Sequence, residues 1–277
     1  MIIIDIAGGL GNQMYGYALY RTLLERGRDV YMNISYYDHQ DSQDLTVRKY
    51  ELSETFHVTE RFTQGFANII RKFRLMRTYR DKNTCFQPEI LDVQKGILTG
   101  CWESFKYSQE IEGILRREFT FRKPLTGKSA QVIDEIRNCN SVSISFRRGD
   151  YVALGRVLPV EYYERAVKYI RQRVPDSKFF CTSDDIDWCK ETFRDHDLTF
   201  IDWSLDDAQY FDMQVISECK YNILANSTFC LWGAWLNQNP NKIVLRPSKY
   251  FFSSKPKYIA LNQRKDFWPD DWISIEA

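Results

Sequence analysis

Two adjacent arginines, Arg147 and Arg148, follow a short apolar run and precede a glycine. The run 142–146 alternates apolar and hydroxyl side chains like a buried strand, and Gly149 permits a tight turn directly after it. The two guanidinium groups are therefore expected at the carboxyl end of a strand, which is where open α/β sheets bind their ligands. A guanidinium group is permanently charged, and its forked donors fit the oxygens of a diphosphate. A surface ion pair with Asp150 is the alternative interpretation of the same residues.

A second candidate for anion binding lies at 222–237, where the pattern predicts a strand, a polar turn and a short helix. The N-cap of this helix is expected at Asn226 or Ser227. The first turn of a helix presents backbone N–H groups without partners and the positive end of the macrodipole, and the hydroxyl groups of Ser227 and Thr228 add further donors. The turn therefore suits a phosphate group, although an ordinary capped helix explains the same residues.

The third candidate is the glycine-rich stretch 8–12, which links a predicted strand at 1–6 to a helical pattern that ends near Gly27. Glycines at such a connection either allow a close approach to phosphate or simply provide a sharp turn. The third glycine position of the dinucleotide-binding fingerprint holds Met14, which disfavours a nicotinamide or flavin enzyme. The chain also lacks the glycine-rich phosphate loop of P-loop nucleotidases.

Strands and helices alternate around these candidates, and this order predicts parallel sheets in an α/β protein. The chain has 277 residues, a length that favours two domains with separate cores. A segment at 122–128 has the proline, glycine and charge content of a connector. The pattern predicts strands at 179–182, 198–201, 221–224 and 242–245, the last of which is expected to close the sheet, and helices at 160–173, 187–193 and 208–219.

In this order, the motifs resemble those of the metal-independent fucosyltransferases, and most closely the bacterial α-1,2-fucosyltransferases of glycosyltransferase family 11. The resemblance spans nearly the whole chain. One departure stands out, because Ser145 occupies the position at which the family usually has a histidine that helps to hold the guanine nucleotide. The motifs that carry the resemblance lie at 8–13, 99–104, 106–107, 147–151, 158–159, 162–163, 182–185, 188–190, 226–229 and 232–235.

The resemblance implies an α/β protein of the GT-B-like class, in which two facing Rossmann-like domains hold the active site in the cleft between them. We expect an N-terminal acceptor-side domain at 1–127 and a C-terminal domain at 128–249 that binds GDP-fucose. The final segment, 250–277, is expected to return to the first domain.

The implied activity is an inverting transfer of L-fucose from GDP-β-L-fucose to the 2-hydroxyl group of a galactoside, expected to be β-linked, in surface-glycan synthesis such as that of O-antigen or capsule. No cofactor or metal is expected. Two alternatives stay open, namely a transferase that uses another nucleotide sugar and an inactive carbohydrate-binding relative. The Asp-x-Asp triplets at 185–187 and 195–197 supply a rival mechanism, in which a divalent cation holds the diphosphate.

The resemblance also assigns roles to individual residues. Arg147 and Arg148 are expected to bind the diphosphate, and Asn12 to orient substrate oxygens. Asp150 is expected either to take the proton of the attacking hydroxyl group or to align a guanidinium group. The expected donor-binding residues are Gly9, Gly11, Asp184, Asp185, Asn226, Ser227, Thr228 and Phe229, of which Asp184 or Asp185 would accept hydrogen bonds from the edge of guanine.

Composition limits the partners and the compartment. The formal charge of +1 disfavours nucleic acid as a partner, and no apolar stretch approaches the length of a membrane span. The start of the chain lacks the features of a secretory leader, and seven cysteines without zinc-type spacing indicate a reducing compartment. We therefore expect a cytoplasmic enzyme whose acceptor is a galactose-containing oligosaccharide or lipid-linked glycan. Cations interleaved with apolar residues at 71–80 suit either a solvated helix or contact with the inner face of the plasma membrane.

Overall fold

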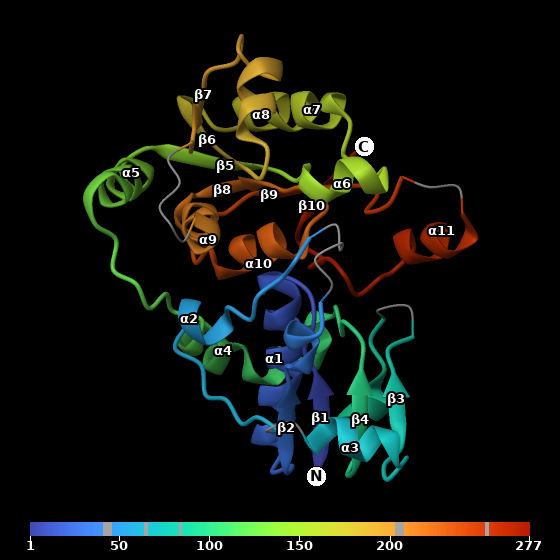
Figure 1. The fold of residues 1–277 in the computed structure, drawn as a ribbon. Coiled ribbons are helices and arrows are strands. Elements are labelled where there is room, and N and C mark those ends of the chain that lie inside the picture. The colour runs from blue at the N-terminus through green and yellow to red at the C-terminus, as the bar shows by residue number, and fades with distance from the viewer. Residues whose placement is uncertain (41–45, 64–65, 83–84, 203–207, 253–254) are drawn as a thin grey trace. The chain divides into compact units, whose positions relative to one another are not determined.

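The computed structural model of the chain describes residues 1–40, 46–63, 66–82, 85–202, 208–252 and 255–277 (Figure 1). The chain divides into two compact α/β units, so the predicted class is confirmed. Unit 1 comprises Met1–Arg122 and Gln263–Pro269, and unit 2 comprises Lys123–Asn262 and Asp270–Ala277. Within the segment 250–277, residues 263–269 thus share the contacts of unit 1, and the flanking residues share those of unit 2. The limits of independently folding domains at 127 and 249 stay predictions.

Unit 1 contains a four-stranded parallel sheet in the order β2-β1-β4-β3. Its central strand β1 begins with three fully buried isoleucines, which is typical of a parallel strand that is covered on both faces. The strands are β1 (Ile2–Asp5), β2 (Val30–Asn33), β3 (Thr78–Arg80) and β4 (Gly96–Thr99).

The helices of unit 1 include α1, which follows β1 through the glycine-rich stretch predicted from the sequence. Gly8 in this stretch has a φ of +83°, and a Cβ atom added to it would lie 2.8 Å from the Asn12 side-chain nitrogen, so the position requires glycine. The helices are α1 (Leu10–Glu25), α2 (Leu52–Thr55), α3 (Phe66–Lys72) and α4 (Glu112–Glu118), with 3-10 turns η1 (Ser35–Asp38), η2 (Pro88–Asp92), η3 (Phe105–Tyr107) and η4 (Gln109–Ile111).

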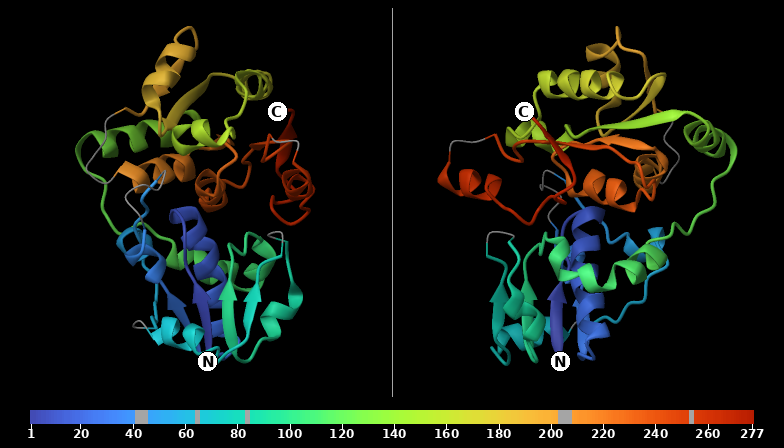
Figure 2. Two further views of the ribbon diagram at one scale, coloured as in Figure 1. Left: turned by 45° about the vertical axis from the view of Figure 1, so that its right-hand side comes forward. Right: turned by 180° about the vertical axis from the view of Figure 1, so that it is seen from behind.

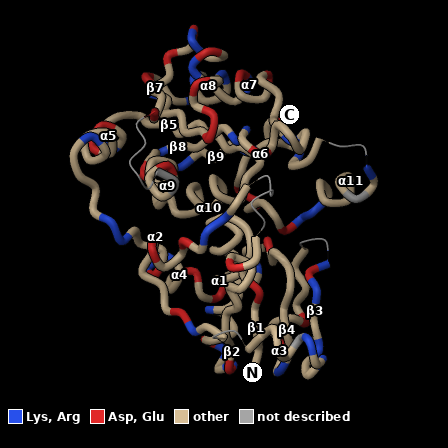
Figure 3. Tube along the Cα trace, in the orientation of Figure 1, with Lys and Arg blue, Asp and Glu red and all other residues tan. Residues whose placement is uncertain are grey.

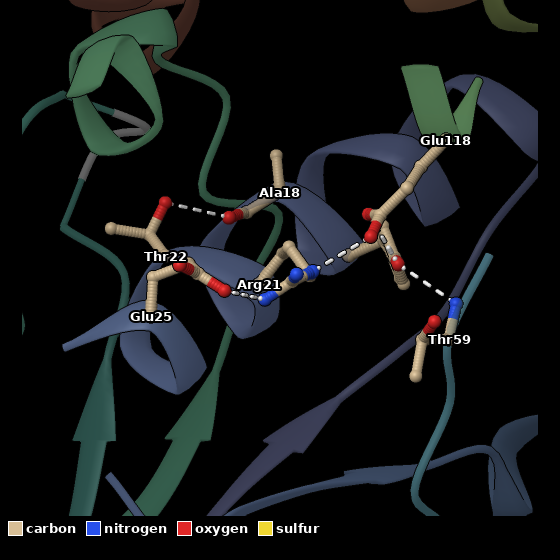
Figure 4. A network of polar contacts seen from close by, with 7 residues as sticks. Ala18, Arg21, Thr22, Glu25, Thr59 and Glu118 are labelled. Atoms are coloured by element: carbon tan, nitrogen blue, oxygen red, sulfur yellow. Dashed lines mark hydrogen bonds and ion pairs between the residues drawn. The ribbon is translucent and has the colours of Figure 1, made fainter. Parts of the chain in front are cut away.

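Polar contacts anchor α1 within unit 1 (Figure 4). The Glu118 carboxylate of α4 accepts hydrogen bonds from the Tyr17 hydroxyl group at 2.7 Å and from Arg21 Nε at 2.9 Å. Arg21 also pairs with Glu25 one turn further along α1. The backbone N–H of Thr59 donates to the Tyr17 oxygen at 3.0 Å. These contacts fix α1 against α4 and the 56–59 segment.

Unit 2 contains a six-stranded parallel sheet in the order β10-β9-β8-β5-β6-β7. Figures 1 and 2 show α7 and α8 on one face of this sheet and α9 and α10 on the other. The strands are β5 (Asn140–Phe146), β6 (Ser177–Ser183), β7 (Leu198–Phe200), β8 (Tyr221–Ile223), β9 (Val244–Pro247) and β10 (Ile273–Ile275). The helices are α5 (Gly127–Arg137), α6 (Gly149–Leu154), α7 (Val160–Arg171), α8 (Ile186–Thr192), α9 (Ala208–Glu218), α10 (Thr228–Leu236) and α11 (Pro256–Asn262).

The predicted strands and helices of unit 2 are all present near these bounds, but β9 begins two residues later than predicted and one edge of the sheet differs. The segment 242–245 was expected to close the sheet, but β9 pairs with both β8 and β10, so β10 forms that edge. The prediction was wrong because three residues of β10, of which only two are apolar, give too short a pattern for a period to be read. No helix in the described ranges is long and apolar enough to span a bilayer.

Candidate active site

A pocket of about 220 Å³ lies in unit 2, where β5 and β6 end. Ser145 of β5 stands opposite Thr182 of β6, and Phe146 stands opposite Ser183. Since the two strands are parallel, the turns that follow them meet at the same edge of the sheet. The residues that supply the polar lining of the pocket include Ser145, Arg147, Thr182, Asp184, Asp212 and Ser227, and Phe229 is among its apolar lining.

Arg147 lies in this pocket between two carboxylates. Its Nη1 atom is 2.7 Å from Asp184 Oδ2, and its Nη2 atom donates to Asp150 Oδ1. Both ion pairs are partly buried, and they hold the side chain in one orientation. A guanidinium group has five N–H donors, and these two contacts leave donors for a ligand. The predicted arginine is therefore held in a defined orientation beside the pocket.

Arg148 takes a different position from its neighbour and does not line the pocket. Its guanidinium carbon lies 3.6 Å from the centroid of the Trp188 ring, and its Nε donates to Asp185 Oδ2 at 2.9 Å. The backbone N–H of Arg148 donates to Asp184 Oδ1 at 2.7 Å. The side chain thus ties the turn after β5 to the turn after β6. Its role toward a diphosphate stays a prediction.

The two acidic residues after β6 both form ion pairs with these arginines. Asp184 bridges Arg147 and the backbone of Arg148, and it lies in the pocket lining. Asp185 is the N-cap of α8, where its Oδ1 accepts from the Trp188 N–H at 3.4 Å, and it lies outside the lining. Of the two residues predicted for guanine, the structure brings only Asp184 into the pocket.

The start of α10 faces the same pocket through Ser227 and Phe229. Ser227 is the N-cap, as one of the two alternatives predicted, and its side chain accepts from the Phe229 N–H at 3.3 Å. Asn226 is fully buried, and its side chain donates to two backbone carbonyl groups, so it supports the turn. The Tyr151 hydroxyl group of α6 donates to the Asn226 carbonyl oxygen at 3.2 Å. This bond links the arginine turn to the helix tip.

Asp212 of α9 is a pocket residue that the sequence did not single out. Burial, and then the nearby charge of Asp184, raise the pKa of Asp212 to about 7. No hydrogen bond or ion pair joins its carboxyl group to another residue in the described part of the chain. The sequence did offer one signal for this residue, namely an acidic residue between the apolar residues Phe211 and Met213. Both neighbours are buried in the structure.

Ser145 and Thr182 form a hydroxyl pair in the lining, with their Oγ atoms 3.2 Å apart. They are 4% and 2% exposed. The Tyr163 hydroxyl group donates to the Ser145 carbonyl oxygen at 3.2 Å, which fixes the end of β5. Ser145, the residue at the position where the family usually has histidine, is therefore paired with a second small hydroxyl side chain.

The predicted residues of the glycine-rich stretch belong to unit 1 and have separate surroundings. Gly9 is the N-cap of α1 and offers no side-chain cap. A Cβ atom added to Gly9 would lie 3.6 Å from an Arg48 guanidinium nitrogen, so a cation stands beside this helix start. Asn12 and Gly11 lie in the first turn of α1. The substrate contacts of these residues stay predictions.

No group of three or more His, Cys, Asp or Glu side chains that could hold a metal ion occurs among the residues whose structure is described. Of the Asp-x-Asp triplets, Asp185 caps α8 and pairs with Arg148. In the other triplet, Asp195 is 88% exposed. Neither triplet forms a cage of carboxylates, and independence from metal stays a prediction.

The sequence model described as "Glycosyl transferase family 11" matches residues 2–275. The chain belongs to this family. It is 32% identical over 298 aligned positions to the α-1,2-colitosyltransferase of Escherichia coli, with 100% of this chain and 99% of that protein covered. It is 27% identical to the human galactoside α-(1,2)-fucosyltransferase 1 over 199 positions, which cover 65% of this chain and 52% of the human protein. The family predicted from the motifs is therefore confirmed.

Among solved structures, the chain is similar to the selenomethionine form of fucosyltransferase NodZ from Bradyrhizobium. The TM-score is 0.52 at 13% identity, and the match covers 88% of this chain and 94% of that chain. At this identity the likeness shows the fold alone, and it confirms the GT-B-like α/β class. The protein is a glycosyltransferase, and its relatives support a nucleotide sugar as the donor.

Proposed function

We propose that the protein transfers L-fucose from GDP-β-L-fucose to the 2-hydroxyl group of a galactoside, with inversion and without a metal ion. One observation carries this proposal, namely that Arg147 and the Ser227 tip of α10 line the same pocket. Such a pocket suits a leaving group that becomes more negative during the reaction. The fucosyltransferases among the relatives support the choice of sugar and linkage.

The electrostatics of the pocket favour departure of a diphosphate. The donors of Arg147 that its two carboxylates leave free reach a phosphate group from one side, and the N-terminus of α10 supplies a positive end of a helix dipole. Both are fixed before the reaction, since Asp150 and Asp184 orient the guanidinium group and Tyr151 ties the helix tip. Preorganised donors stabilise charge in the transition state without reorganisation. This arrangement needs no divalent cation to neutralise the diphosphate.

Asp212 supplies a carboxyl group for the guanine base. Guanine presents two adjacent N–H donors on one edge, and an ionised carboxylate accepts both. The raised pKa of Asp212 means that part of the population is protonated near neutral pH, so binding of the base would release a proton. Asp184, one of the two residues expected for this role, instead pairs with Arg147 and accepts from the backbone N–H of Arg148.

A colitosyl donor is the second candidate, because the relative that is 32% identical over the full chain is a colitosyltransferase. The same pocket and the same charge chemistry would serve both donors. Only the sugar would differ. The seven cysteines, all free thiols in the structure, support a reducing compartment and hence a cytoplasmic enzyme under either donor.

A donor comparison tests the proposal. The purified protein is incubated with GDP-fucose, with a GDP-colitosyl donor and with a UDP-hexose, each with a β-galactoside acceptor and EDTA, and the product linkage is determined by NMR. An α-1,2-fucosylated product in the presence of EDTA is expected. Turnover only with the colitosyl donor supports the second candidate. Strict dependence on a divalent cation contradicts the proposed mechanism, and tight glycan binding without any turnover indicates a binding protein.

A further inference from the structure

Helix α3 of unit 1 carries apolar side chains on two faces. Ala67 and Ile70 are buried and pack with Ile3 of β1. On the other side, Ile69 of α3 and Phe73, the residue directly after α3, are 57% and 63% exposed. A helix on the surface of a globular unit normally keeps its outer face polar. Packing within unit 1 therefore accounts for the inner face alone.

The turn that follows α3 extends this outer surface. Leu75 is 61% exposed. Of the eight large apolar side chains that are exposed in the described ranges, three thus lie within the seven positions 69–75. Lys72, Arg74 and Arg77 are exposed beside them. We call these six exposed residues, Ile69, Lys72, Phe73, Arg74, Leu75 and Arg77, the α3 patch.

The charged side chains of the α3 patch are all positive. Residues 62–80 include five Lys or Arg and no Asp or Glu, and Figure 3 shows the cations along α3 and toward β3. No ion pair joins Lys72, Arg74 or Arg77 to an acidic side chain within the ranges that the structure describes. The nearby carboxylate of Asp29 is engaged by the Met1 amino group at 3.7 Å and by Arg61 at 3.5 Å. Among the described residues, no acidic side chain thus pairs with the three cations of the patch.

The backbone at Arg74 adds a third observation. Arg74 has a φ of +51°, and the Leu75 N–H donates to the Ile70 carbonyl oxygen at 3.0 Å. This is the bond of a Schellman-type helix end, in which glycine usually takes the left-handed position. The chain keeps a cation there although glycine would adopt that conformation without strain. Replacement of Arg74 by glycine is thus compatible with the local fold.

We propose that the α3 patch docks the protein onto the surface of an anionic lipid bilayer. Ile69, Phe73 and Leu75 enter the headgroup region, and the flanking cations contact lipid phosphate groups. Apolar side chains ringed by Lys and Arg are the pattern of interfacial membrane binding. Nucleic-acid binding would account for the clustered cations but gives no role to the exposed Ile69 and Leu75 side chains. The proposal does not depend on the donor pocket, which lies in unit 2.

Sedimentation of the full chain with lipid vesicles tests the proposal. The protein is expected to bind phosphatidylcholine vesicles that contain phosphatidylglycerol, and to bind vesicles of phosphatidylcholine alone much more weakly. High salt should weaken the binding because it screens the surface potential. Arg74→Gly should lower the affinity about fivefold, as expected for the loss of one cation near an anionic surface. Its melting temperature should stay equal to or above that of the wild type, which separates lost binding from misfolding.

A second variant tests the apolar part of the α3 patch. The triple change Ile69→Ser, Phe73→Ser and Leu75→Ser should abolish sedimentation with anionic vesicles even at low salt. The matched control replaces Val47 by Ser and Arg117 by Gln, two residues exposed elsewhere on unit 1, and should bind like the wild type.

Several results would overturn the proposal. One is a wild-type chain that does not sediment with anionic vesicles, and another is a patch variant that binds as tightly as the control. A third is a role of the patch in dimer formation alone. In that case, light scattering would show that the patch variants lose a dimer that the wild type forms, while their binding to vesicles would not change. Binding of RNA that the patch variants lose, without vesicle binding by the wild type, also contradicts it.

Discussion

The turn after β5 in unit 2 and the loop after β1 in unit 1 have the same local design, a parallel strand that leads through glycine into a helix. They differ in the groups that surround them. In unit 2, Arg147 is clamped by Asp150 and Asp184, and a second helix tip at Ser227 faces the same pocket. In unit 1, the helix starts at an uncapped Gly9, and Asn12 follows in its first turn.

We infer from this difference that the two units bind different groups of the substrates. A fixed cation and a helix dipole at one pocket are suited to a charged diphosphate. The loop of unit 1 offers the amide of Asn12, which suits the hydroxyl groups of a sugar, with the Arg48 guanidinium group beside the helix start. The comparison favours the pocket of unit 2 for the diphosphate, and we propose the Asn12 amide of unit 1 as a contact for the acceptor. Changes at the two loops should then affect different substrates.

The largest effect is expected at the cation of unit 2. Arg147→Ala should lower kcat/KM for the nucleotide sugar by about a hundredfold or more, because single preorganised donors at developing charge have effects of this size. The matched control, Arg117→Ala, removes an exposed arginine of α4 and should leave steady-state kinetics unchanged. Normal turnover by the Arg147→Ala variant would contradict the proposal that this guanidinium group stabilises the leaving diphosphate.

A smaller and different effect is expected in unit 1. Asn12→Ala should raise the KM for the acceptor about fivefold, the effect of one lost hydrogen bond, and leave the affinity for GDP unchanged. Alanine is a strong helix former, so α1 should remain intact. If GDP affinity falls and the acceptor KM does not change, the two units do not divide the substrates in this way.

The N-terminus of α10 should contribute more to stability through its cap than the N-terminus of α5. Ser227→Ala removes the cap of α10 and should lower the free energy of unfolding by about 0.5–2 kcal/mol. Thr126 precedes α5 without a side-chain cap bond, so Thr126→Ala should have little effect in the same denaturant titration. Equal losses from the two variants would mean that the Ser227 contact does not hold the tip.

The effect expected at Asp212 differs from the others because it depends on pH. The pKa of Asp212 is raised from 3.8 to about 7, so the folded protein binds more protons than the unfolded chain between these values, and ionisation destabilises the fold as the pH rises through this window. The melting temperature of Asp212→Asn should rise relative to that of the wild type as the pH increases from about 4 to 7, because the variant has no carboxyl group to ionise. The exposed Asp195 is the control, because Asp195→Asn should show no such trend. A constant offset at Asp212 would contradict the pKa shift.

Much of unit 2 was predictable because its pattern is strong. The strand before Arg147 and the cap at Ser227 follow from alternation and from hydroxyl chemistry, and the structure has both. Asp212 was missed because its place in the pocket beside Asp184 is a tertiary contact, and no local spacing predicts such a contact. For the same reason, the sequence predicted the same role for Arg147 and Arg148. In the structure, Arg148 stacks on the Trp188 ring and does not line the pocket.

Calorimetric titration of nucleoside diphosphates into the purified chain, with EDTA present, tests the central claim most directly. The account predicts that GDP binds more tightly than UDP or ADP and that Arg147→Ala weakens GDP binding by at least about tenfold, the loss of a charge-assisted contact. Equal affinity for all three nucleotides, or GDP binding that does not change in Arg147→Ala, would contradict it.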